Sequence, residues 1–144
     1  MSDVSGGLID TNVLIHALTT DRESQDCREF LLRVRRGEQS FTLTTVIVYE
    51  VTYALGRYKK EMSRAEIGDY LISVMALPNV RVDDDALFGA VRAWSMNPEL
   101  GFADAYLGVR AERDRVPVYT KNVRHFRQFD VEVPNPLAPS DAGD

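Results

Sequence analysis

Three acidic residues stand in otherwise apolar stretches of this chain. Asp10 ends the run GLID, Glu50 lies inside VIVYEVTYAL, and Asp104 lies inside GFADAYLGVRA. A carboxylate beside apolar packing is costly unless a cation compensates its charge, and Mg²⁺ and Mn²⁺ prefer carboxylate and water oxygens as ligands. Together the three acids predict a metal site, where an ion would lower the pKa of a water for hydrolysis.

Each acid also has an ordinary explanation when it is taken alone. Asp10 and Asp104 could each cap a helix, because Asp accepts hydrogen bonds from the unpaired amides at a helix start. Glu50 could pair with a neighbouring basic residue. We favour the metal site because all three ordinary explanations would otherwise have to hold at once.

The hydrophobic pattern indicates the elements that must position these acids. Short apolar or β-branched runs alternate with longer amphipathic ones, which is typical of a parallel sheet covered by helices. We expect strands near residues 7–10, 40–43, 80–82 and 116–120, with a possible short edge strand at 131–133. Strand ends and helix starts meet at one edge of such a sheet, so Asp10 and Asp104 should share a crevice. Glu50 should border the buried stripe of a helix over residues 45–58, a stripe formed by Ile47, Val51, Ala54 and Tyr58.

Polar residues mark further helix starts. Thr20 with Glu23, and Ser63 with Glu66, have the S/T-x-x-E spacing of a capping box. The acidic triple at 83–85 predicts another start, because the helix dipole stabilises carboxylates there. These acids therefore need no functional explanation.

The composition is typical of one folded domain. The chain has 144 residues, of which 44% are hydrophobic and 27% charged, enough for a single core. We assign residues 1–137 to one domain and expect 138–144 to be frayed. No apolar run approaches the ~20 residues needed to span a bilayer, and Met1 is not followed by a signal core, so we expect a cytoplasmic protein. The single cysteine, Cys27, excludes an intrachain disulfide and is expected in the core.

The charge pattern is less decisive. A net charge of -5 argues weakly against general attraction to nucleic acid. Basic clusters within 33–36, 57–64 and 110–115 could flank an acidic pocket, or could equally be solvated helix ends.

Four stretches of the chain resemble the PIN domain family, and within it the VapC-type toxins. They are LIDTNVL, the helix with Glu50, FADAYL, and YTKNVRHF leading to VPNP, and they span residues 8–136 in the family's order. The resemblance implies a three-layer α/β/α sandwich with a central parallel sheet, and a Mg²⁺- or Mn²⁺-dependent endoribonuclease. It also implies a homodimer inhibited by a cognate antitoxin protein. Asp10, Glu50 and Asp104 match the family's three principal acids, with Asp10 and Asp104 as direct metal ligands.

The chain departs from the stricter family pattern after Thr120. Many relatives carry a further acid there, whereas this chain has Asn122 and His125. An amide supplies less charge than a carboxylate, which favours one tightly held ion, with Asn122 forming part of the catalytic wall. Thr120 is expected to hydrogen-bond an active-site carboxylate, as the resemblance also suggests.

Other polar residues beside the expected site have supporting assignments. Thr11 and Asn12 should brace the carboxylate pocket, or else satisfy the first amides of a helix. Lys121, Arg124 and His125 are expected to contact RNA phosphates, which fix the register of the substrate without reading its sequence. Target choice would then depend on RNA shape and exposed loop bases.

Two other functions remain open from the sequence. The missing acid around Asn122 also suits a PIN-like module that has lost catalysis and acts as an RNA-binding or assembly partner. A phosphatase or phospho-receiver, phosphorylated on Asp10, shares the strand-end aspartate. Asn12 counts against the phosphatase, which would need an acid two residues after Asp10, and a receiver would need paired acids at its first strand.

Overall fold

A three-stranded parallel sheet organises the part of the chain that the computed structural model describes, residues 6–134. Its strands are β1 (Gly7–Leu8), β2 (Phe41–Leu43) and β3 (Val80–Val82), in the order β1-β2-β3. Phe41 lies opposite Gly7 on one side and Val80 on the other. Because all three strands run the same way, their carboxyl ends share one edge of the sheet.

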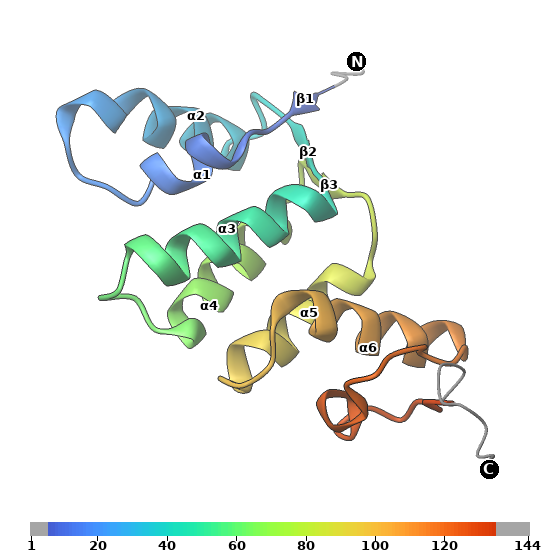
Figure 1. Ribbon diagram of the computed structural model, residues 1–144. Coiled ribbons are helices and arrows are strands. Elements are labelled where there is room, and N and C mark those ends of the chain that lie inside the picture. The colour runs from blue at the N-terminus through green and yellow to red at the C-terminus, as the bar shows by residue number, and fades with distance from the viewer. Residues whose placement is uncertain (1–5, 135–144) are drawn as a thin grey trace, which may run out of the picture.

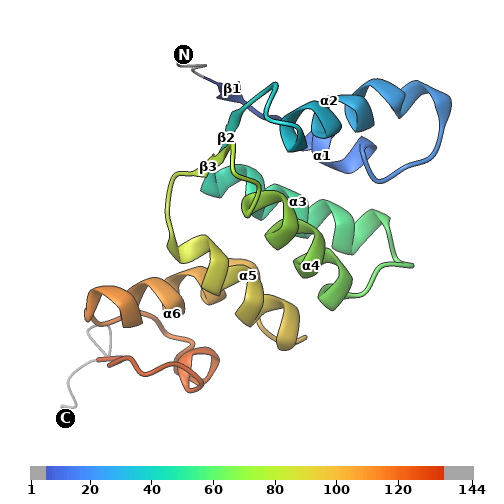
Figure 2. The same cartoon turned by 180° about the vertical axis from the view of Figure 1, so that it is seen from behind.

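Helices connect and flank these strands. They are α1 (Thr11–His16), η1 (Arg22–Ser24), α2 (Gln25–Arg35), α3 (Thr45–Tyr58), α4 (Arg64–Met75), α5 (Ala86–Met96), α6 (Phe102–Asp114) and η2 (Val123–Phe126). Figure 1 shows α1 and α2 beside the strands, α3 and α4 together below them, and α5 and α6 together farther away; Figure 2 shows the same arrangement from behind. The structure confirms the α/β class, with helices flanking a parallel sheet.

Two predicted helix starts are present. The Ser63 side chain accepts from the Glu66 amide at 3.1 Å, and the Glu66 side chain accepts from the Ser63 amide at 2.8 Å, which completes the capping box of α4. Thr44 caps α3 by accepting from the Ile47 amide, and α3 has the bounds expected from the sequence. Satisfying these otherwise unpaired amides stabilises each helix by about 1 kcal/mol.

The capping box predicted at Thr20 and Glu23 is wrong. Asp21 is the residue that caps this stretch, and its Oδ1 accepts from the Ser24 amide at 2.8 Å. A carboxylate is a stronger acceptor than a hydroxyl, so Asp21 replaces its neighbour, and the helix it starts is the short η1.

The core lies mainly between α3, α4 and α5. Each of these helices buries at least two aliphatic side chains to 1% exposure or less: Val51, Leu55, Ile67, Leu71, Leu87 and Val91. Burying one such side chain is worth about 1.5–3 kcal/mol. Helix α3 is central to this packing because it contacts α1, α4 and α6. It therefore connects the N-terminal part of the chain to the C-terminal part.

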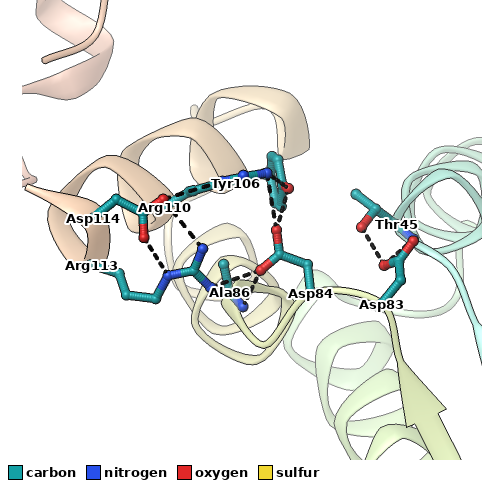
Figure 3. Close-up of polar contacts among 8 residues, drawn as sticks. All are labelled: Thr45, Asp83, Asp84, Ala86, Tyr106, Arg110, Arg113 and Asp114. Atoms are coloured by element: carbon teal, nitrogen blue, oxygen red, sulfur yellow. Dashed lines mark hydrogen bonds and ion pairs between the residues drawn. The ribbon is translucent and has the colours of Figure 1, made fainter. Parts of the chain in front are cut away.

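Asp84 joins α5 to α6 (Figure 3). Its carboxylate accepts from the Ala86 amide at 2.9 Å, from the Tyr106 hydroxyl, and from Arg113 and Arg110 at 2.8 and 3.2 Å. Burial alone would raise the pKa of Asp84, but these hydrogen bonds outweigh burial and hold the pKa at about 2. The carboxylate is thus ionised and structural, as expected for an acid at a helix start.

The neighbouring Asp83 has a similar role at the edge of the sheet. Its Oδ1 accepts from the amide and the hydroxyl of Thr45, at 2.9 and 2.7 Å (Figure 3). The bond ties the residue after β3 to the first turn of α3, so the start of α3 is fixed relative to the sheet.

The strand predicted at 116–120 and the edge strand predicted at 131–133 are both wrong. Pro117 has no amide hydrogen to donate to a ladder, and among the described residues a single backbone bond, from the Val118 amide to the Glu132 carbonyl at 3.0 Å, joins the two stretches. Val118 instead packs with Ala111 and Phe126 in a small separate core against α6. Among the described residues the sheet therefore has three strands and ends at β1.

Two other expectations concern the chain as a whole. The tail expected to fray, residues 138–144, lies outside the described residues. No helix within 6–134 is long and apolar enough to cross a membrane.

Candidate functional site

Asp10 stands between β1 and α1, at the edge where the strands end. The preceding residue, Ile9, is buried, and its amide still pairs with the Thr42 carbonyl of β2 at 3.3 Å. Asp10 is the N-cap of α1, yet its side chain makes no capping hydrogen bond. The helix therefore does not use this carboxylate, which is exposed beside a pocket.

Glu50 reaches the same pocket from the middle of α3. It is exposed, and its Oε1 accepts a hydrogen bond of 2.6 Å from the hydroxyl of Thr11. Thr11 is itself only 9% exposed, so its hydroxyl is held in place by the surrounding packing. Among the described residues Thr11 is the only donor to Glu50, which leaves Oε2 of the carboxylate available to a ligand.

The pocket has a volume of about 590 Å³ and is open to solvent. Asp10, Thr11, Asn12 and Glu50 supply its polar lining, and tyrosines of α3 supply much of the rest. Four of the residues expected at the site are thus brought together here.

Asp104 lies in a second, adjoining pocket. It stands in the first turn of α6, and its Oδ2 is 2.7 Å from Nδ1 of His125 in η2. Because a carboxylate only accepts, Nδ1 carries the proton of this hydrogen bond. The second pocket has a volume of about 530 Å³ and is lined by residues of α3, α4, α5 and α6.

The structure does not place Asp104 beside Asp10 and Glu50. Within residues 6–134 no three Asp, Glu, His or Cys side chains are grouped closely enough to hold a metal ion. Tyr49 and Tyr53 line both pockets, and Tyr49 stacks on Phe102 with ring centroids 6.1 Å apart. The two pockets therefore share aromatic lining from α3, while their acids belong to different pockets.

The residues after Thr120 are also outside the first pocket. The Thr120 hydroxyl accepts from the Asn122 amide at 2.9 Å, and this is the bond that the structure gives it in place of the expected carboxylate contact. Lys121 is exposed. Arg124 and His125 line another hollow, together with Asn97, Glu99, Leu100 and Gln128.

Cys27 is half-buried near Asp10, and both line a further shallow pocket. Partial burial raises the pKa of this thiol. A thiol with a raised pKa is a poor nucleophile at neutral pH. The expectation that Cys27 lies in the core is wrong, because its side chain is only half-buried.

The donors in the first pocket fit a hard divalent cation. Asp10 and Glu50 offer carboxylate oxygens and Asn12 an amide oxygen. Mg²⁺ is usually held in proteins by one or two carboxylates and keeps several of its waters. Two carboxylates in an open pocket match that requirement without a third protein acid.

Residues 7–132 match the PIN domain family, and this match covers most of the chain. The chain belongs to the PIN domain family. PIN domains are generally nucleases and typically use divalent metal ions, so the paired carboxylates of this PIN domain are its strongest candidate for a reactive centre. A comparison with curated proteins found no match to this PIN domain.

The sequence pattern missed the tyrosines of this PIN domain. Tyr58 was expected on the buried stripe of α3, yet it is 75% exposed, whereas Val48 and Thr52 are buried. The i, i+4 spacing of Tyr49 and Tyr53 is the signal for their shared face. Sequence alone did not show that this face borders both acidic pockets.

Proposed function

We propose that this PIN domain is a metal-dependent endoribonuclease that hydrolyses RNA phosphodiester bonds. The observation that carries the proposal is the pairing of Asp10 and Glu50 in one open pocket, with Thr11 donating to Glu50. The membership of the chain in a family of nucleases supports it.

The side chains of the pocket divide the chemistry. Asp10 and Glu50 would hold Mg²⁺ or Mn²⁺, which when bound lowers the pKa of a water and offsets charge on the phosphoryl oxygens. Thr11 occupies Oε1 of Glu50, so Oε2 can accept a hydrogen bond from the attacking water and orient it. Asn12 braces the same wall through its side-chain amide.

The remaining assignments rest on the resemblance to VapC-type toxins. We propose Asp104 as a third ligand, which requires it to give up its hydrogen bond with His125. Asn122 and Thr120 would form the far wall of the site. Lys121, Arg124 and His125 would contact phosphates of the RNA.

RNA cleavage in different metals tests this function. Wild type should cleave RNA with Mg²⁺ or Mn²⁺ and not with EDTA, and Asp10→Asn should abolish cleavage. Asp69→Asn, on the exposed side of α4, is the matched control and should retain activity. Cleavage that persists in EDTA and is unaffected by Asp10→Asn would refute the proposal.

We further propose that the protein acts in the cytoplasm as the toxin of a toxin–antitoxin pair, as a homodimer held inactive by its antitoxin. LIDTNVL and FADAYL, in which it resembles VapC-type toxins, support this role. Induced expression should arrest growth and Asp10→Asn should not, while co-expression of the product of an adjacent small gene should restore growth. Growth arrest by Asp10→Asn to the same extent would contradict the toxin mechanism.

One observation favours a second candidate, a PIN-like module that binds RNA or a protein without cleaving. Asp104 is bonded to His125 and stands apart from Asp10 and Glu50. Titration calorimetry with Mn²⁺ distinguishes the two functions. Binding that depends on Asp10 and Glu50 supports the nuclease, and the absence of Mn²⁺ binding supports the module.

A further inference from the structure

Helix α3 exposes three tyrosines along the border of the Asp10–Glu50 pocket. Tyr49, Tyr53 and Tyr58 are 50%, 60% and 75% exposed and all line that pocket. Tyr49 is engaged within the chain because it stacks on Phe102. Tyr53 and Tyr58 have no such aromatic partner among the described residues, so their rings are available to an external ligand.

Arg57 lies close to both of these rings. Its guanidinium carbon lies 6.0 Å from the Tyr53 ring centroid and 5.7 Å from that of Tyr58, and Nη1 donates to the Tyr53 hydroxyl at 3.2 Å. No carboxylate within the described part of the chain pairs with Arg57. Its positive charge is thus beside two exposed rings and uncompensated by an acid.

An aromatic surface of this kind suits single-stranded nucleic acid. Bases stack on aromatic side chains whatever their sequence, and a nearby cation contacts the phosphates. Lys60, exposed just after α3, adds a second positive charge. A purely apolar protein partner would leave Arg57 unpaired, so charge complementarity favours a polyanion.

The spacing along α3 relates this surface to the carboxylates. Tyr53 and Tyr58 follow Glu50 by three and eight residues, which is about 5 Å and 12 Å along a helix axis. Neighbouring stacked nucleotides of one strand are about 3.4 Å apart. The rings therefore lie about one to four nucleotides from a phosphate held at Glu50.

We propose that Tyr53 and Tyr58, held by Arg57, form a stacking platform for unpaired bases of an RNA strand whose phosphate lies at the Asp10–Glu50 pocket. This proposal rests on the proposed nuclease function and adds to it the residues that hold the bases of the substrate. The platform requires unpaired bases, because paired bases do not present their faces to a side chain.

Binding without cleavage tests the platform. Fluorescence anisotropy in EDTA would compare a short labelled single-stranded RNA with an abasic strand of the same length, using wild type, Tyr53→Leu, Tyr58→Leu and the double variant. Each single variant should weaken RNA binding about fivefold to tenfold, with little change for the abasic strand. Tyr58→Phe should bind as wild type does, since the ring is retained. Tyr53→Phe should keep most of the affinity, because it keeps the ring and loses only the hydrogen bond from Arg57.

Tyr119→Leu is the matched control, because Tyr119 is 68% exposed and is not among the residues that line either acidic pocket. It should leave RNA affinity unchanged. Circular dichroism of each variant checks that the fold is retained, as expected for exposed side chains.

Two results would overturn the platform. One is that the double leucine variant binds RNA as tightly as wild type does, or that it loses the same affinity for the abasic strand as for the intact strand. The other is a double variant that changes from dimer to monomer in light scattering while RNA affinity holds, which would make this face an interface between copies. If Asp10-dependent cleavage persists in either case, the nuclease function stands and the platform is refuted. If RNA binding depends on the tyrosines but no cleavage is seen, the platform stands and the nuclease function is refuted.

Discussion

The hydroxyl of Thr11 donates a 2.6 Å hydrogen bond to Oε1 of Glu50 and so joins the first residue of α1 to the middle of α3. Glu50 is one of the two carboxylates proposed to bind the metal ion. The bond orients it, although Thr11 is not itself a proposed ligand. Residues in such a position commonly change metal affinity or activity by about 10- to 100-fold when they are replaced.

Thr11→Val should therefore lower Mn²⁺ affinity and RNA cleavage by about tenfold, while Thr11→Ser, which keeps the hydroxyl, should change them little. Calorimetry and a cleavage assay provide the measurements. Equal behaviour of the valine and serine variants would show that the hydroxyl is not what orients Glu50.

Asp10 and Glu50 share one pocket and Asp104 lies in another, so the three acids should contribute unequally to Mn²⁺ binding. Asp10→Asn and Glu50→Gln should each abolish tight Mn²⁺ binding, since these two are the carboxylates that line the first pocket among the described residues. Asp104→Asn should weaken Mn²⁺ binding less, because the wild-type acid must first leave His125. If Asp104→Asn has no effect on Mn²⁺ affinity at all, Asp104 is not a ligand.

Asp84 should make stability depend on acid pH. Its pKa of about 2 in the folded protein is below the value of about 3.9 in an unfolded chain. Its contribution is thus fully present above about pH 4 and is lost as pH falls toward 2. The side chain is 12% exposed while its arginine partners are half-exposed, so we expect about 1–2 kcal/mol.

Urea unfolding of wild type and Asp84→Asn between pH 2 and 7 measures this contribution. The difference in unfolding free energy between them should be largest at pH 7 and shrink as the pH falls toward the Asp84 pKa of about 2. A difference that stays constant across this range would mean that ionisation of Asp84 is not the source of the stability.

Arg64 holds the connection between α5 and α6. Its Nη1 donates to the carbonyls of Trp94, Asn97 and Leu100 at 2.9, 2.9 and 2.6 Å, and its guanidinium lies 4.5 Å from the Trp94 ring centroid. Arg64→Leu leaves these carbonyls without their donor and should cost about 2–3 kcal/mol, with Arg64→Lys intermediate. Urea unfolding followed by the fluorescence of Trp94 would show a lower midpoint, and an unchanged midpoint would contradict the assignment.

Replacing Arg57 should change the salt dependence of RNA binding. If it contacts one phosphate, Arg57→Gln should reduce the slope of log affinity against log salt by about 0.7 for a single strand. Arg92→Gln, on the exposed side of α5, is a suitable control. An unchanged slope for Arg57→Gln would place the phosphates elsewhere.

Local signals predicted the parts of the fold that local interactions determine. The bounds of α3 and β3, and the capping box at Ser63, follow from short-range pattern and hydrogen bonding. The stretch at 116–120 has the composition of a strand, but Pro117 and its packing against α6 override that preference. Tertiary packing of this kind leaves no periodic trace in sequence.

The same distinction applies to the candidate site. The sequence predicted that Asp10 would share a crevice with Asp104, whereas the structure brings Asp10 into one pocket with Glu50. Asp10 follows β1, and Glu50 belongs to the helix that follows β2. The place of Asp104 depends on how α6 packs on α5 and on α3, and on the stacking of Phe102 with Tyr49. Those contacts join distant parts of the chain, so the sequence showed the acid without showing its neighbours.

Helix α3 carries Glu50, Tyr53 and Arg57 and also contacts α1, α4 and α6. Opening of this one helix would remove a carboxylate, the aromatic surface and the packing between the two parts of the chain in a single cooperative event. Amide hydrogens in the middle of α3 should therefore exchange with solvent only through global unfolding of the protein. Loss of the site and loss of the fold would then be the same transition.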